Sequence, residues 1–187
     1  MVYNPELHHR RSIRLQGYDY AITGAYFVTI CTQGRECLFG EVVSGVMIPT
    51  PAGEMMTQVW QELPQHYPGV EIDVHVVMPD HFHGIIHLTT PPVGADPRGR
   101  PDLCHGPGHP QGGAPTSLSL GDVVHRFKSM TTHAYATGVK QHGWTPFPGR
   151  IWQSNYHERI VRDEAERTAL CEYMVDNPAR FAPITNP

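Results

Sequence analysis

The chain has 187 residues, 40% of them hydrophobic, and a formal net charge of −4 at pH 7. This length suits one domain, 1–187, that buries its own core, and the acidic balance excludes a protein that coats nucleic acid through charge alone. No apolar run approaches the length of a membrane span, residues 1–20 are too polar for a signal peptide, and the four cysteines form no C-x-x-C pair. We therefore expect a cytoplasmic protein without a disulfide framework.

A basic arm precedes the first predicted core strand. Residues 1–20 are expected to be extended, and Arg10, Arg11 and Arg14 give them a local cluster of positive charge. Residues 25–32 are rich in β-branched and aromatic side chains, which predicts a strand.

A hairpin and a helix are expected next. Two short apolar runs, 41–43 and 46–48, flank Ser44-Gly45, a sequence typical of a tight hairpin turn. A helix is predicted over 50–63, with Pro64 and Pro68 ending it.

The next two strands carry the first candidate site. Strands are predicted over 70–77 and 81–88, separated by a turn at Pro79-Asp80. Side chains alternate along a strand, so His81 and His83 share one face while Phe82, Ile86 and Leu88 point into a core. Two imidazoles whose backbones are roughly 6.6 Å apart can bind one divalent metal ion. A solvated histidine pair on an edge strand is the alternative.

A Pro/Gly-rich segment interrupts this pattern. Residues 91–115 contain 13 Pro or Gly in 25 positions, which cannot pack as regular structure. We expect a flexible surface insertion, and a lid over the site is the second interpretation.

The last third of the chain predicts a helix over 118–139, extended structure over 151–161, and a final helix from Asp163 to Pro178. The first six elements of the domain then read βαββαβ, apart from the short hairpin. That order is typical of an α+β, ferredoxin-like or RRM-like fold: a four-stranded antiparallel sheet with helices on one face. The first and third strands lie centrally in this topology, and the final helix is additional.

The final helix carries the second candidate site. Tyr173 and Asn177 are four residues apart and therefore share one helix face. A tyrosine beside a metal held by two histidines could attack a phosphodiester and form a phosphotyrosine link. Each residue also has a simpler explanation, because Tyr173 could pack against the domain and Asn177 could end the helix before Pro178.

These segments together resemble the single-tyrosine HUH transposases of the IS200 type, most closely the REP-associated tyrosine transposases of bacteria. The similarity covers nearly the whole chain. It is carried by the segments 10–15, 24–32, 77–84, 127–129, 152–164 and 172–178.

The resemblance implies that His81 and His83 bind Mg²⁺ or Mn²⁺, that Asn177 is the third ligand, and that Tyr173 is the nucleophile. It implies cleavage and transfer of single-stranded DNA beside a REP-like hairpin through a 5′-phosphotyrosine intermediate. Tyr156 is a rival nucleophile that we rank below Tyr173.

The expected DNA contacts are the basic arm with Arg10, Arg11 and Arg14, together with Tyr18, Tyr20 and Trp152 through stacking. Lys128 could contact the scissile phosphate region or could be a solvated lysine.

Two other functions stay open: a domesticated module that binds hairpin DNA without cutting it, and a hydrolase of small phosphoesters. The sequence also leaves open whether the protein is a monomer or a homodimer.

Overall fold

The structure is a computed structural model that describes residues 22–89 and 118–182. The basic arm expected over 1–20, including Arg10, Arg11 and Arg14, and the insertion at 91–115 lie outside the described residues. The elements are β1 (Gly24–Cys31), η1 (Gln33–Arg35), β2 (Gly40–Val43), β3 (Val46–Pro49), α1 (Pro51–His66), β4 (Val70–Met78), β5 (His81–Leu88), α2 (Leu120–His142), β6 (His157–Val161) and α3 (Glu164–Arg180). No helix within these described ranges is long and apolar enough to cross a membrane.

Four antiparallel strands form the main sheet in the order β4-β5-β1-β6. The first and third strands of the predicted βαββαβ pattern, β1 and β5, are therefore central, as expected. The histidine strand lies mid-sheet, which excludes the solvated edge-strand alternative.

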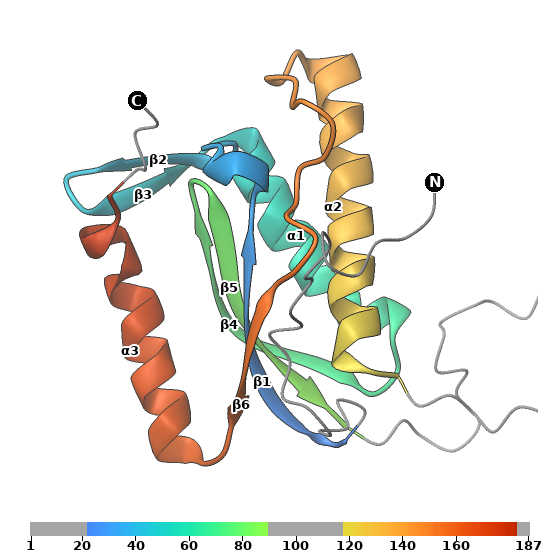
Figure 1. Ribbon diagram of the computed structural model, residues 1–187, viewed down its shortest axis with the longest axis vertical. Helices are drawn as coiled ribbons and strands as arrows, with labels where there is room; N and C mark the ends of the chain where they lie inside the picture. The colour runs from blue at the N-terminus through green and yellow to red at the C-terminus, as the bar shows by residue number, and fades with distance from the viewer. Residues whose placement is uncertain (1–21, 90–117, 183–187) are drawn as a thin grey trace, which may run out of the picture.

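The two faces of the sheet are covered unequally (Figure 1). Helices α1 and α2 cover one face, where Tyr26, Val28 and Ile30 of β1 and Phe82 of β5 join a large buried core. Helix α3 lies alone on the opposite face, held by a small buried cluster of Phe27, Ile85, Leu170 and Met174. The site-bearing face thus has much the smaller core.

Gly84 of β5 follows His83 in the sequence and allows α1 to pack closely on the face of the sheet opposite the histidines. A Cβ added there would lie 2.6 Å from the Trp60 ring, and Trp60 is fully buried. The small residue after His83 is therefore explained by packing on the opposite face of its strand.

Prolines do not end the helices where the sequence suggested. Helix α1 starts as predicted, with Thr50 accepting a hydrogen bond from Gly53 N, but it continues past Pro64 to His66. Helix α3 likewise continues past Pro178 to Arg180. A proline in the last turn removes only one backbone hydrogen bond, so packing of the preceding turns keeps the helix intact.

The second long helix and the last strand also differ in extent from the prediction. Helix α2 has the expected Ser119 cap, in a capping box with Asp122, and extends to His142 before Gly143 ends it in the left-handed conformation. Only His157–Val161 of the predicted 151–161 segment pairs as a strand. Trp152 makes an isolated bridge to Thr32, and the residues between form a loop.

The predicted hairpin is confirmed as β2 and β3. Ser44 and Gly45 both have positive φ, 52° and 78°, as a tight two-residue turn between twisted strands requires. The hairpin lies beside the C-terminal end of α3 (Figure 1), with Gly45 next to Ala179.

Candidate active site

His81 and His83 are buried on the face of the sheet that α3 covers. Cys31 and Thr29 of β1 are their direct cross-strand neighbours. The two histidines are only 6% and 3% exposed, and their ring centroids are 4.7 Å apart. The strand alternation predicted from sequence therefore brings both imidazoles together.

The nitrogens of His83 have different surroundings. Its Nδ1 shares a 2.7 Å hydrogen bond with Thr29 Oγ1. Its Nε2 is buried and has no hydrogen-bond partner among the described residues. Burial lowers the pKa of His83 to about 3, with the neighbouring His81 charge a smaller cause, so the ring is neutral at physiological pH. A buried, neutral and unpaired Nε2 is available to a ligand.

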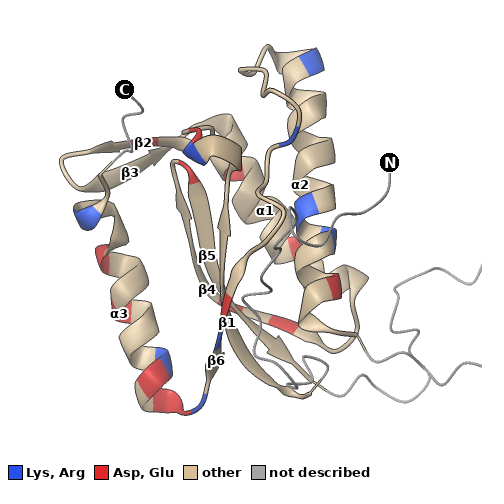
Figure 2. Ribbon diagram, viewed as in Figure 1, with Lys and Arg blue, Asp and Glu red and all other residues tan. Residues whose placement is uncertain are grey.

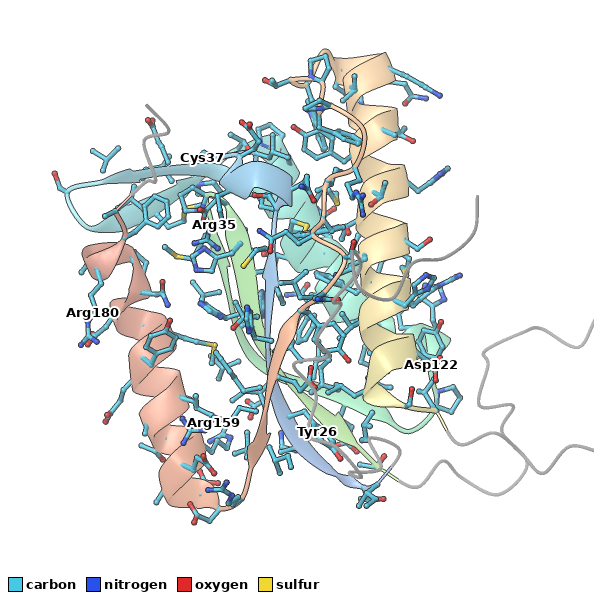
Figure 3. All side chains as sticks on the ribbon, viewed as in Figure 1. Tyr26, Arg35, Cys37, Asp122, Arg159 and Arg180 are labelled. Carbon is cyan, nitrogen blue, oxygen red and sulfur yellow. The ribbon has the colours of Figure 1, made fainter. Side chains whose placement is uncertain are left out.

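Asp80 orients the second imidazole. One of its carboxylate oxygens accepts a 2.5 Å hydrogen bond from His81 Nδ1, and the other pairs with Arg35 Nε at 2.8 Å. The Asp80 carbonyl accepts hydrogen bonds from both the amide and the hydroxyl of Thr32, each at 2.9 Å. Figure 3 shows Arg35 extending from η1 towards this turn between β4 and β5. With Nδ1 held by the carboxylate, His81 also presents its Nε2.

Helix α3 brings Tyr173 to the same place. The Tyr173 ring centroid is 5.5 Å from that of His83 and 6.3 Å from that of Phe27, which itself stacks on His83 at 5.2 Å. Tyr173 is 41% exposed, so its phenol borders solvent instead of the core. Tyr173 thus packs one side of its ring against Phe27 and His83 and exposes the rest, and its role as nucleophile stays a prediction.

Asn177 lies one turn further along α3. It is 8% exposed and follows Leu170 and Met174 in the buried stripe of the helix. This position places Asn177 on the face of α3 turned towards the sheet. Its role as third metal ligand stays a prediction.

The side chains at this site can be compared with the ligands that a divalent metal ion needs. Within residues 22–89 and 118–182, no group of three His, Cys, Asp or Glu side chains could hold a metal. Two imidazoles and a carboxamide would instead be needed, the set that the family resemblance implies. The orphaned Nε2 of His83 and the carboxylate-oriented ring of His81 fit such an ion, and imidazole donors favour Mn²⁺ over Mg²⁺.

Comparison with known proteins places the chain among relatives. An uncharacterized protein of Haemophilus influenzae is 38% identical over 179 residues, which cover 94% of this chain and 92% of the relative. The chain belongs to the same family as that protein. No protein-family model matches the chain.

One solved structure identifies the fold. A REP-associated tyrosine transposase, solved bound to a REP hairpin, aligns with a TM-score of 0.55 at 20% identity, covering 90% of this chain and 74% of the other. The chain has the fold of that transposase. A candidate transposase from Deinococcus radiodurans aligns with a TM-score of 0.46 at 16% identity, covering 89% of this chain and 98% of the other.

Within this fold, Lys128 is part of the framework of the loop before β6. Its Nζ donates hydrogen bonds to Gln153 O at 2.8 Å and Asn155 O at 3.0 Å, and it lies 5.6 Å from the centre of the Tyr156 ring. Burial lowers the pKa of Lys128 to about 8. Lys128 is therefore not a freely solvated lysine, and its contact with DNA stays a prediction.

Two aromatic residues lie in the core instead of at the surface. Trp152 is 4% exposed and donates a 3.0 Å hydrogen bond from Nε1 to Thr131 Oγ1. Base stacking needs an exposed ring face, so the position of Trp152 corrects the expectation on which its DNA contact was based. Tyr156 is also buried, which agrees with ranking it below Tyr173 as nucleophile.

Residues that the sequence did not indicate complete the surroundings of α3. Asp73 lies where two residues of β4, 73 and 74, oppose one of β5, and this bulge directs it towards α3. Its two carboxylate oxygens accept hydrogen bonds from Arg167 Nε and Nη2, at 2.6 and 2.9 Å, and it pairs with His87 at 3.3 Å. Helix α3 is thus attached to the outer strand of the sheet, a contact between segments 94 residues apart that no local pattern predicts.

Proposed function

We propose that this protein is a metal-dependent endonuclease and strand transferase that cuts single-stranded DNA beside a hairpin. The observation that carries the proposal is the half-exposed Tyr173 phenol beside His83, whose buried Nε2 has no protein partner among the described residues. A nucleophile and an unsatisfied metal-binding donor at one place are what such a reaction requires.

In the proposed reaction, the Tyr173 oxygen attacks the scissile phosphorus and loses its proton to solvent. The bond from phosphorus to the 3′ oxygen breaks and that oxygen takes a proton from solvent, which leaves a 5′-phosphotyrosine and a free 3′-hydroxyl. Attack by another 3′-hydroxyl reverses these steps and transfers the strand. The metal, held by His81, His83 and Asn177, would supply Lewis-acid stabilisation of the phosphoryl oxygens.

The charge distribution supports a nucleic acid partner. Residues 118–155 carry four Lys or Arg and one acid, whereas residues 22–89 carry one Arg and seven acids. In Figure 2 the basic positions of the first set lie along α2 and the loop after it. The solved relative in fold, which is bound to a REP hairpin, suggests that this partner is hairpin DNA.

A covalent adduct tests the proposal. Purified protein incubated with Mn²⁺ and a labelled hairpin oligonucleotide with a single-stranded flank should form an adduct that survives denaturing electrophoresis. Tyr173→Phe should abolish it, because the attacking oxygen is lost, whereas Tyr156→Phe should retain it. An adduct that persists in Tyr173→Phe would refute the assignment of the nucleophile.

A hairpin-binding module without cleavage activity is the second candidate. The observation in its favour is that the solved transposase of the same fold is bound to a REP hairpin, which concerns binding and not cleavage. Tight hairpin binding in chelator, with no adduct under Mg²⁺ or Mn²⁺, would establish this function instead.

A further inference from the structure

A pocket lies between β6 and α3, with Tyr173 in its wall. Its volume is about 370 Å³, within the range of ligand-binding cavities in proteins. Its wall combines apolar and polar side chains, among them Phe27, Ala169, Leu170, His157, Arg159 and Glu166. Of these lining residues, the reaction steps proposed above use Tyr173 alone.

The pocket and the candidate active site share three side chains. Phe27 stacks on His83, and Thr29 is hydrogen-bonded to His83 Nδ1; both also line the pocket, and Tyr173 borders the pocket and the site. A ligand bound in the pocket would therefore contact the Tyr173 phenol, and only one layer of side chains would separate it from the imidazole of His83.

The chemistry of the pocket suits a planar, amphipathic group. Phe27 and Leu170 belong to the small apolar cluster under α3 and offer a hydrophobic wall. At the rim, the Arg159 guanidinium, 61% exposed, donates a 2.7 Å hydrogen bond from Nε to Glu166. Figure 3 shows Arg159 between β6 and α3.

A nucleobase has these properties, with an apolar face for the wall and polar edges for the rim. A base within a duplex stays stacked and paired, whereas a base in a single strand can turn out into a pocket at little cost. This difference favours the single-stranded flank over the hairpin stem.

We propose that the pocket binds the base of a nucleotide that flanks the scissile phosphate, and so helps to select the cleavage position. This inference rests on the proposed function, since it needs a DNA strand that passes Tyr173. His157, Arg159 and Glu166 are the side chains placed to contact the base edge.

Filling the pocket tests the proposal. Ala169→Phe puts a ring into the cavity from α3 without removing a polar group, and Ala165→Phe, one turn earlier on the same helix, is the matched control. Each protein is given hairpin oligonucleotides that carry a normal or an abasic nucleotide on either side of the cleavage position. Two quantities are measured: the dissociation constant in chelator and the adduct yield with Mn²⁺.

We expect an abasic nucleotide at one flanking position to weaken binding to the wild type and to Ala165→Phe by about 5- to 100-fold, the usual effect of one stacked base. Ala169→Phe should bind the normal oligonucleotide as weakly as the wild type binds the abasic one, and should not respond to the abasic change. The proposal is overturned if Ala169→Phe and the wild type respond equally at both positions. Binding is measured in chelator, so the test of the pocket does not depend on cleavage. If the wild type forms no covalent adduct with Mn²⁺, the proposed cleavage is refuted and not the base-binding pocket.

Discussion

Asp80 illustrates how one buried side chain can prepare a metal ligand. It holds His81 Nδ1 on one oxygen and Arg35 on the other, and it is 1% exposed. The imidazole is therefore fixed in the orientation that presents Nε2, as carboxylates behind metal-bound histidines commonly do.

Loss of this orientation should weaken metal binding. We expect Asp80→Ala to reduce affinity for Mn²⁺ by about 10- to 100-fold, as removal of such outer partners typically does, and Asp80→Asn to restore part of it because the amide oxygen still accepts from Nδ1. Isothermal titration calorimetry of the folded proteins measures the affinity. Asp176→Ala, an exposed carboxylate on α3, is the control and should leave it unchanged. Equal affinity in Asp80→Ala and wild type would show that Asp80 does not orient the ligand.

Some individual residues of the candidate site could be predicted from the sequence, and others could not. His81, His83 and Tyr173 could be found because strand alternation and helix spacing are local patterns. Phe27 and Arg35 could not, since their contacts with His83 and Asp80 join segments far apart in the chain. The aromatic character of Trp152 suggested stacking on a base, but identity alone does not distinguish an exposed ring from a buried one.

Among the elements, α3 is attached to the sheet by few contacts, and the pair of Arg167 with Asp73 is one of them. The hydrogen bond from Arg167 holds the pKa of Asp73 at about 2, below its ordinary value of 3.8. The folded protein thus favours the ionised carboxylate. This contribution to stability is complete above pH 4 and is lost as the pH falls from about 4 to 2.

Asp73→Asn removes this contribution. We expect its free energy of unfolding at pH 7 to be lower by about 1 kcal/mol, a value reduced from the pKa shift because solvent screens a partly exposed pair. The difference from wild type should vanish near pH 2. Urea unfolding at several pH values measures both effects. A constant difference from pH 7 to pH 2 would mean that the carboxylate charge is not the cause.

The extent of the elements was less predictable than their order. Patterns of apolar residues predicted α2 from its one buried face of helical spacing, and β1 and β5 from short apolar runs that are buried in the sheet. Pro64 and Pro178 suggested helix ends, but packing on the sheet outweighed one missing hydrogen bond. The apolar residues of 151–156 are buried against α2 without pairing as a strand, and hydrophobicity alone does not separate these two outcomes.

For the molecule as a whole, charge is divided between the two sides of the sheet. Basic residues collect on α2 and the following loop, while α3 carries mostly acidic ones (Figure 2). The hairpin stem should therefore contact the α2 side, in spite of the net charge of −4, while its single-stranded flank passes Tyr173 on the α3 side.

The salt dependence of hairpin binding tests whether the DNA contacts the α2 side. We expect Arg126→Ala, on the exposed face of α2, to weaken hairpin binding and to reduce the slope of log affinity against log salt by about one, because one phosphate contact is lost. Arg180→Ala, whose guanidinium pairs with Asp176 on α3, should leave the slope unchanged. Fluorescence anisotropy between about 50 and 200 mM salt, the range in which such contacts are sensitive, measures both. Identical slopes for Arg126→Ala and wild type would place the DNA elsewhere.

The unequal covering of the sheet has a consequence for how such a protein can evolve. Folding depends mainly on the tightly interlocked layer of α1 and α2, whereas the residues beside Tyr173 contribute little to it. Substitutions along α3 and β6 can therefore accumulate without unfolding the chain. Descendants of one ancestor could acquire new target preferences on this side while their architecture stays the same.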